Sequence, residues 1–116
     1  MLRNEMIYTA TATITAGEAS AGKTVTLGFS PRWIRIWNAT QGLIIEWMDT
    51  LEDADYFQIT DTDTDTAEGS TPSADGVKFV TTGGITIVDA DIDSEAGFSI
   101  DAGLCTESDV LHILAI

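Results

Sequence analysis

The chain has 116 residues, of which 44% are hydrophobic and 21% are charged, the composition of one globular domain with a single hydrophobic core. Five lysine and arginine residues stand against nineteen aspartate and glutamate residues, so the formal net charge is −14. A surface this acidic repels phosphate groups, and we therefore expect neither a nucleic acid nor an anionic membrane surface as a partner.

The charge is unevenly distributed along the chain. Residues 1–35 carry a net charge of +2, whereas residues 36–116 hold one lysine against seventeen acidic residues, a net charge of −16. Cys105 is the only cysteine, so no disulfide can form within the chain. No signal peptide and no membrane-spanning run is recognisable. We therefore expect a soluble protein that is made in a reducing compartment.

The first thirty residues show two segments with the period of a β-strand. In residues 6–15, threonines alternate with mostly apolar residues, which predicts a strand with one polar and one apolar face. The small residues at 16–22 predict a loop. Residues 24–29 alternate again and predict a second strand, which Pro31 ends because proline cannot donate a hydrogen bond to a strand ladder.

Residues 32–38 and 43–48 predict a β-hairpin around the turn at 38–42. Pairing Asn38 with Leu43 gives one wholly apolar face, made of Ile34, Ile36, Ile45 and Trp47. On the opposite face Arg35 meets Glu46, Trp37 meets Ile44, and Trp33 meets Met48. A shift by one residue would destroy both the apolar face and the charge pair, so we predict this register.

The second face of this hairpin is also mostly apolar, which is unusual for an antiparallel sheet in a small protein. It therefore packs against a second sheet, a loop of the same chain or a neighbouring subunit. Tryptophan, methionine and arginine are enriched in the cores of protein interfaces. The candidate protein-interface residues are Trp33, Arg35, Trp37 and Met48, together with Arg3 in the basic N-terminal segment.

Further short strands are predicted at residues 56–60, 77–81, 85–88, 97–100 and 110–116. The acidic and polar residues 61–76 predict a long exposed loop, and Thr-Gly-Gly at 82–84 predicts a hairpin between the strands on either side. The last strand is apolar on both faces, which places it in the middle of a sheet. Eight or nine strands without a long helix predict one all-β domain over residues 1–116, an antiparallel β-sandwich or a jelly-roll-like barrel.

Residues 17–24, Gly-Glu-Ala-Ser-Ala-Gly-Lys-Thr, match the P-loop pattern of nucleotide-binding proteins. In those proteins the motif follows a strand and opens a helix, whose N-terminus binds phosphate. Here residues 25–31 predict a strand, and the βαβ alternation of a nucleotide-binding sheet is absent. We therefore interpret the match as a turn between two strands. A nucleotide-binding enzyme is an alternative that rests on this motif alone.

Two acidic runs, at residues 61–65 and 89–93, resemble the start of calcium-binding loops. Both lack the glycine at the sixth position and the acidic residue at the twelfth that an EF-hand requires. An irregular calcium site, or a glycan site built on exposed tryptophans, is therefore kept only as an alternative. The chain offers few candidate catalytic residues, since we expect His112 to be half-buried and Cys105 to be buried away from it. We predict no enzyme activity and no cofactor.

The order of several short motifs resembles that of small structural proteins of tailed bacteriophages. The first is Gly28-Phe-Ser-Pro-Arg-Trp-Ile-Arg-Ile-Trp-Asn38, followed by the apolar strand with Glu46 and Trp47. Similar elements follow in the same order: Gly83-Gly-Ile-Thr86, Gly97-Phe-Ser-Ile100 and Ser108-Asp-Val-Leu111, before the terminal strand. The resemblance covers most of the chain from about Thr24 onward.

This resemblance implies a virion structural protein, above all a capsid decoration (cement) protein. Such proteins bind the outside of an assembled head and reinforce the joints between major capsid protein subunits, often as trimers. The implied partner is thus the major capsid protein, the implied assembly is a homo-oligomer with a trimer favoured, and the implied location is the capsid exterior after synthesis in the host cytoplasm. A tail or neck protein is the alternative of the same kind.

Overall fold

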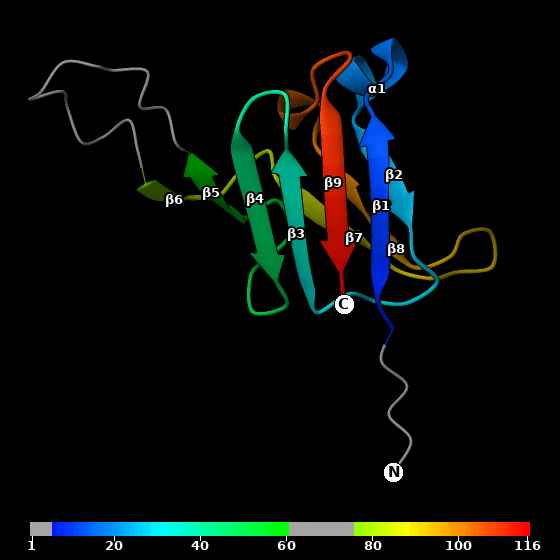
Figure 1. Ribbon diagram of the computed structural model, residues 1–116. Coiled ribbons are helices and arrows are strands. Elements are labelled where there is room, and N and C mark those ends of the chain that lie inside the picture. Colours follow the sequence, from blue (N-terminus) through cyan, green and yellow to red (C-terminus); the bar gives the residue numbers. More distant parts are fainter. Residues whose placement is uncertain (1–5, 61–75) are drawn as a thin grey trace, which may run out of the picture.

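The computed structural model describes residues 6–60 and 76–116 as a sandwich of two antiparallel β-sheets. The strands are β1 (Tyr8–Thr13), β2 (Lys23–Thr26), β3 (Trp33–Asn38), β4 (Leu43–Met48), β5 (Tyr56–Thr60), β6 (Gly76–Val80), β7 (Ile85–Val88), β8 (Gly97–Ile100) and β9 (Val110–Ala115). One sheet has the order β1-β9-β3-β4-β5-β6 and the other has the order β2-β8-β7. Figure 1 shows the three-stranded sheet as a second layer behind the larger one. The predicted all-β sandwich is thus confirmed.

Strands β3 and β4 pair in the predicted register, from Asn38 opposite Leu43 to Trp33 opposite Met48. The side chains of β3 alternate between two environments. Ile34 and Ile36 are fully buried, whereas Trp33, Arg35 and Trp37 are only partly buried. This hairpin therefore divides its side chains between the core of the sandwich and the opposite side of the sheet, as the alternating pattern predicts.

The terminal strand β9 lies in the interior of the six-stranded sheet, between β1 and β3, which confirms its predicted place. The core forms where the two sheets face each other. The larger sheet contributes Ile34, Ile36, Ile45, Trp47, Leu111 and Ile113, and the smaller sheet contributes Val25, Ile85, Phe98 and Ile100. Burial of these side chains is the main source of stability, at about 25 cal/mol per Å² of apolar surface.

The prediction of a loop at residues 16–22 was wrong, since Ala16–Ala21 form the short helix α1. The physical reason is a capping box at its start. The backbone N–H of Glu18 donates to Thr15 Oγ1 at 3.2 Å, and the backbone N–H of Thr15 donates to Glu18 Oε1 at 3.0 Å. These bonds satisfy amides that a helix N-terminus otherwise leaves free. The helix ends at Gly22, whose φ of 91° stops the helical backbone.

The predicted hairpin around residues 82–84 was also wrong. β6 pairs with β5 in the larger sheet, and β7 pairs with β8 in the smaller one, so the connection crosses between the layers. Gly83 has a φ of 70° at this corner, and Gly84 packs so closely against the ring of Tyr56 that a side chain has no room. The glycines that suggested a hairpin therefore serve a corner between sheets. The predicted loop at 61–76 lies outside the described residues, except for Gly76.

A buried polar cluster joins the β3–β4 turn to the start of β9. Asn38 Nδ2 donates to Asp109 Oδ2 at 2.9 Å, and Gln41 Nε2 donates to the same oxygen at 2.7 Å. Asn38 and Asp109 are 1% and 2% exposed, so neither can exchange its partner for water. The backbone N–H of Gln41 donates to Asn38 Oδ1 at 3.0 Å, which closes the turn.

Replacing Asn38 by alanine should lower the free energy of unfolding by about 2 to 3 kcal/mol, because a buried carboxylate loses one of its donors. Gln41→Ala removes an exposed donor to the same carboxylate and should cost only about 1 kcal/mol. Urea denaturation of both variants measures the difference. Equal effects of the two substitutions would contradict the buried role of Asn38.

Gly97 and Gly17 offer a matched test of the sheet packing. A Cβ atom at Gly97 would collide with the backbone of Val25 in the paired strand β2, whereas a Cβ atom at Gly17 meets nothing closer than 4.0 Å. We expect Gly97→Ala to cost about 3 kcal/mol through overpacking, and Gly17→Ala to be neutral or to stabilise helix α1 by up to about 1 kcal/mol. Thermal and urea unfolding check both values, and a tolerated Gly97→Ala would show that β2 and β8 are not packed as described.

Candidate functional site

The candidate site is the side of the six-stranded sheet that faces away from the smaller sheet, here called the outer face. Strand register assigns to it Thr9 and Thr11 of β1, His112 and Leu114 of β9, Trp33, Arg35 and Trp37 of β3, Ile44, Glu46 and Met48 of β4, Phe57 and Ile59 of β5, and Val77 and Phe79 of β6. Figure 1 shows no described helix or loop lying over β1, β9, β3 and β4 on this side. The outer face is therefore a broad surface with many apolar side chains and no cover from the described chain.

The apolar side chains of the outer face are continuous across neighbouring strands. One row runs Val77, Ile59, Ile44, Trp37, and the next begins Phe79, Phe57. The rings of Phe57 and Phe79 contact each other with centroids 5.2 Å apart. Val77 and Phe79, at the edge of the sheet, are 68% and 48% exposed. A contiguous apolar patch of this kind is the mark of an interaction surface.

An ion pair lies in the middle of this apolar surface. Arg35 Nε is 3.3 Å from Glu46 Oε2, and Trp33 Nε1 donates a hydrogen bond to the same oxygen at 3.0 Å. The guanidinium carbon of Arg35 is 5.6 Å from the centroid of the Trp37 ring, a distance at which cation and ring attract. Arg35 and Glu46 are the charged residues of the outer face, so the face is neutral overall, although the chain carries a net charge of −14.

The structure brings four of the five predicted interface residues together. Trp33, Arg35, Trp37 and Met48 occupy adjacent positions on β3 and β4 of the outer face, all partly buried by their neighbours. Arg3 lies outside the described residues. The sequence did not predict that β5, β6 and β9 also contribute residues to the outer face. Their alternating patterns show that each strand has two faces, but not which strands lie beside the hairpin.

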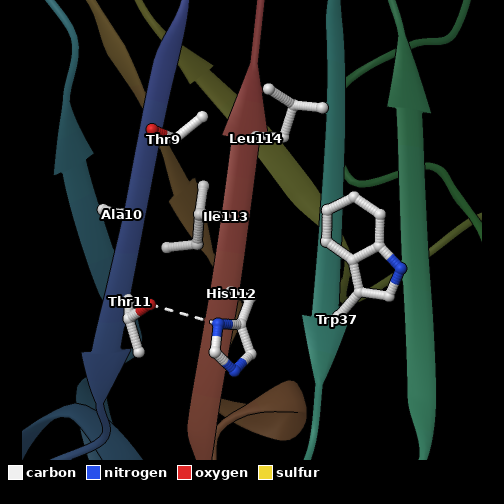
Figure 2. Close-up of a pocket in the computed structure, with 7 residues that line it drawn as sticks. All are labelled: Thr9, Ala10, Thr11, Trp37, His112, Ile113 and Leu114. Atoms are coloured by element: carbon white, nitrogen blue, oxygen red, sulfur yellow. Dashed lines mark hydrogen bonds between the residues drawn. The ribbon is translucent and has the colours of Figure 1, made fainter.

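A shallow depression of about 440 Å³ lies on the outer face between β1, β9 and β3. Figure 2 shows the side chains of Thr9, Thr11, His112, Leu114 and Trp37 around it. Thr11 Oγ1 is 3.1 Å from Nδ1 of His112, within hydrogen-bond distance. The expectation of a half-buried His112 was wrong: its neighbours in β9 face the core, so the histidine points to the outer face and is exposed.

Cys105 belongs to the core and not to the outer face, so the thiol and the histidine do not form a pair. Burial raises the pKa of the Cys105 thiol, and the negative charge of Glu18 adds to the increase. A thiol with a raised pKa is a weak nucleophile at neutral pH. The predicted burial of Cys105 is confirmed, with 4% of the residue exposed.

The segment that matches the P-loop pattern has a different geometry. Helix α1 ends at Ala21, before the lysine of the motif, and Lys23 is the first residue of strand β2. Lys23 Nζ lies 2.8 Å from Glu18 Oε2, so the lysine binds a carboxylate of the same motif. A strand follows as expected, but it spans only Lys23–Thr26, so it begins inside the motif and ends before residues 27–31. The expected simple turn is the helix α1. This segment does not form the helix N-terminus that binds phosphate in nucleotide-binding proteins.

The second acidic run, at residues 89–93, forms a turn in which Asp91 accepts hydrogen bonds from the chain. Asp91 Oδ1 accepts from the backbone N–H groups of Asp93 at 2.7 Å and Ser94 at 2.8 Å, which lowers the pKa of Asp91. Within residues 6–60 and 76–116, no group of three metal-ligating side chains is placed to hold a metal ion. The acidic run at 61–65 lies outside these ranges. No helix in the described parts of the chain is long and apolar enough to cross a membrane.

Comparison with known proteins gives no match, whether to a protein family, to curated proteins or to solved structures. The geometry of the outer face is therefore the structural observation that bears on function.

The bond between Lys23 and Glu18 predicts a measurable shift. This bond, with help from Thr15, lowers the pKa of Glu18 in the folded protein. Lys23→Ala should therefore raise the pKa of Glu18, which NMR titration of the carboxyl carbon measures. Arg32→Ala, which removes the same charge from an exposed position elsewhere, is the control and should leave the pKa of Glu18 unchanged.

The same pKa shift gives a stability that depends on pH. A lowered pKa in the folded state means that Glu18 stabilises the fold at neutral pH and loses this contribution as the pH falls through the range below about 4.3. Lys23→Ala should reduce the loss between pH 6 and pH 3 in urea denaturation. An unchanged pKa of Glu18 in this variant would show that the bond is not formed in solution.

Proposed function

We propose that the protein is a virion structural subunit, a capsid decoration protein that binds the major capsid protein of an assembled phage head through the outer face. The observation that carries the proposal is this face itself: a neutral, largely apolar surface that spans the strands of the larger sheet. The resemblance in sequence supports the phage assignment, and the outer face supports binding to another protein subunit.

The outer face has the physical properties of a protein-binding surface. Trp33, Trp37 and Met48 stand on a rigid antiparallel sheet, so little conformational entropy is lost when a partner covers them. Aromatic and arginine side chains at the centre of an interface usually contribute most of the binding energy. Trp37 and Arg35, which attract each other on β3, are the residues that we expect to contribute most to binding.

The charge distribution also supports binding at this face. The chain carries a net charge of −14, so the surface outside the outer face repels an acidic partner and attracts a basic one. The neutral outer face lets a partner pack closely without burying unpaired charge. We therefore expect a partner surface with an apolar centre and basic residues around it, and an association rate that falls as salt increases.

The resemblance further supports a homo-oligomer, with a trimer as the expected form. The mass of the isolated protein in solution, measured by sedimentation or light scattering, tests this part separately from capsid binding. A monomer would leave capsid binding intact as a proposal but would remove the trimer.

Quantitative mass spectrometry of purified virions tests the assignment directly. Copy number equal to that of the major capsid protein, or a simple fraction of it, is the result expected for a decoration protein. A few copies per particle would indicate a tail or neck protein. Absence from the particle would contradict a virion function altogether.

Trp37→Asp should abolish binding to undecorated capsids, with a loss of affinity of at least about 30-fold, because it buries a carboxylate at the centre of the interface. Thr50→Asp introduces the same charge at an exposed position in the turn after β4 and should bind normally. Co-sedimentation with capsids measures binding, and circular dichroism confirms that both variants are folded. Normal binding by a folded Trp37→Asp variant would exclude the outer face as the interface.

A further inference from the structure

The two sheets have four edge strands, and three of these edges are protected. An unpaired edge exposes backbone N–H and C=O groups, so natural proteins usually cover it or place charges and irregularities along it. At β7, Asp53 Oδ1 accepts from the backbone N–H of Ile87 at 3.1 Å, and the N–H of Ala54 donates to the C=O of Ile85 at 2.7 Å. The loop before β5 therefore covers the edge of β7.

The edges of β6 and β2 are protected differently. Strand β6 carries Lys78 at its centre, a residue that discourages pairing with another strand. Strand β2 has four residues, begins with Lys23 and runs into Gly28, whose φ is 81°. Both Leu27 and Gly28 donate to the C=O of Ala96, which distorts the ladder at its end. Such a short and irregular edge is a poor template for a further strand.

Within the residues that the structure describes, strand β1 has none of these protective features: no covering loop, no charged residue and no irregularity in its ladder. It has six residues, and residues 6–17 contain no charged residue and no proline. In the described chain, β1 pairs with β9 on one side and with no strand on the other. It is therefore the one long, regular and uncharged edge among the described strands.

The hydrogen-bonding direction of each β1 residue follows from the ladder. The N–H of Ile14 donates to the C=O of Asp109 at 2.8 Å, so the even-numbered residues point their backbone groups toward β9. The odd-numbered residues Thr9, Thr11 and Thr13 therefore point their N–H and C=O groups to the open side. All three threonines are exposed.

The surroundings of this edge are acidic. Figure 1 shows the loop between β7 and β8 projecting past β1 on the same side of the molecule. Its four carboxylates, from Asp89, Asp91, Asp93 and Glu95, are exposed, and none makes an ion pair with a described residue. An added strand at the edge of β1 would thus lie on the side of the molecule that carries this uncompensated negative charge.

We infer that β1 is a docking edge for an extended, basic segment of another protein chain, which pairs as an additional strand with Thr9, Thr11 and Thr13. Backbone hydrogen bonds supply the binding, and lysine or arginine side chains of the segment meet the β7–β8 loop. A second copy of this chain fits poorly, because both copies would carry a net charge of −14. This inference concerns the edge of the sheet and holds whether or not the outer face binds a capsid.

A peptide probe tests the inference. A seven-residue peptide of alternating lysine and valine, with blocked termini, should slow amide hydrogen exchange at Thr9, Thr11 and Thr13 in the full-length protein. The same peptide with glutamate in place of lysine should bind at least about tenfold more weakly. A lysine–valine peptide methylated on every backbone nitrogen should not bind, because neither of its edges has an N–H group to donate to the ladder.

Two substitutions at one position separate backbone pairing from side-chain effects. Thr11→Pro removes an N–H that makes no bond within the sheet, so the fold should persist, since proline is accepted at such edge positions. It should abolish peptide binding. Thr11→Val also removes the hydroxyl beside His112 but keeps the N–H, and it should bind the peptide as the parent protein does.

Several outcomes would overturn the inference. These are equal binding of the methylated and unmethylated peptides, no binding of either peptide, and protection of outer-face residues in place of β1. A concentration-dependent dimer that Thr11→Pro disrupts would assign the edge to a second copy and would overturn it too. If Thr11→Pro does not fold, the comparison of the methylated and unmethylated lysine–valine peptides still tests the inference.

Discussion

The pairing register of β3 and β4 is the constraint on which the rest of the structure depends. Because side chains alternate along a strand, a shift by one residue would place Trp33, Arg35 and Trp37 in the core and Ile34 and Ile36 outside. The observed register instead gives the smaller sheet a largely apolar surface to pack on. It also assembles the outer face, so the core and the proposed binding surface have one common cause.

Charge distinguishes two regions of the larger sheet from the rest of the molecular surface. A chain with nineteen acidic and five basic residues repels copies of itself over most of its surface. Two regions of the larger sheet are exceptions: the outer face, where one ion pair balances itself, and strand β1, which has no charge at all. Both exceptions offer contact to a partner, the first through side chains and the second through the backbone.

Alternating hydrophobicity was sufficient to predict the β3–β4 register, and apolar residues on both faces of the last strand were sufficient to predict the central place of β9, because each follows from local pattern alone. The period of a strand does not identify its neighbour, and so the positions of β5, β6 and His112 on the outer face were not predictable. The change of sheet at Gly83 and Gly84 depends on the ring of Tyr56, a contact distant in sequence. Helix α1 is different: Thr15 and Glu18 have the spacing of a capping box, and the signal was present but overlooked.

The pair formed by Arg35 and Glu46 limits how a partner can sit on the outer face. A wholly apolar surface would accept a partner in many orientations of nearly equal energy, since apolar contact has little directional preference. A polar pair among aromatic rings must instead be matched by groups at one place on the partner, or its desolvation goes uncompensated. A partner on the outer face would thereby be held at a single rotational angle, which is what the proposed binding to a lattice of identical capsid subunits requires.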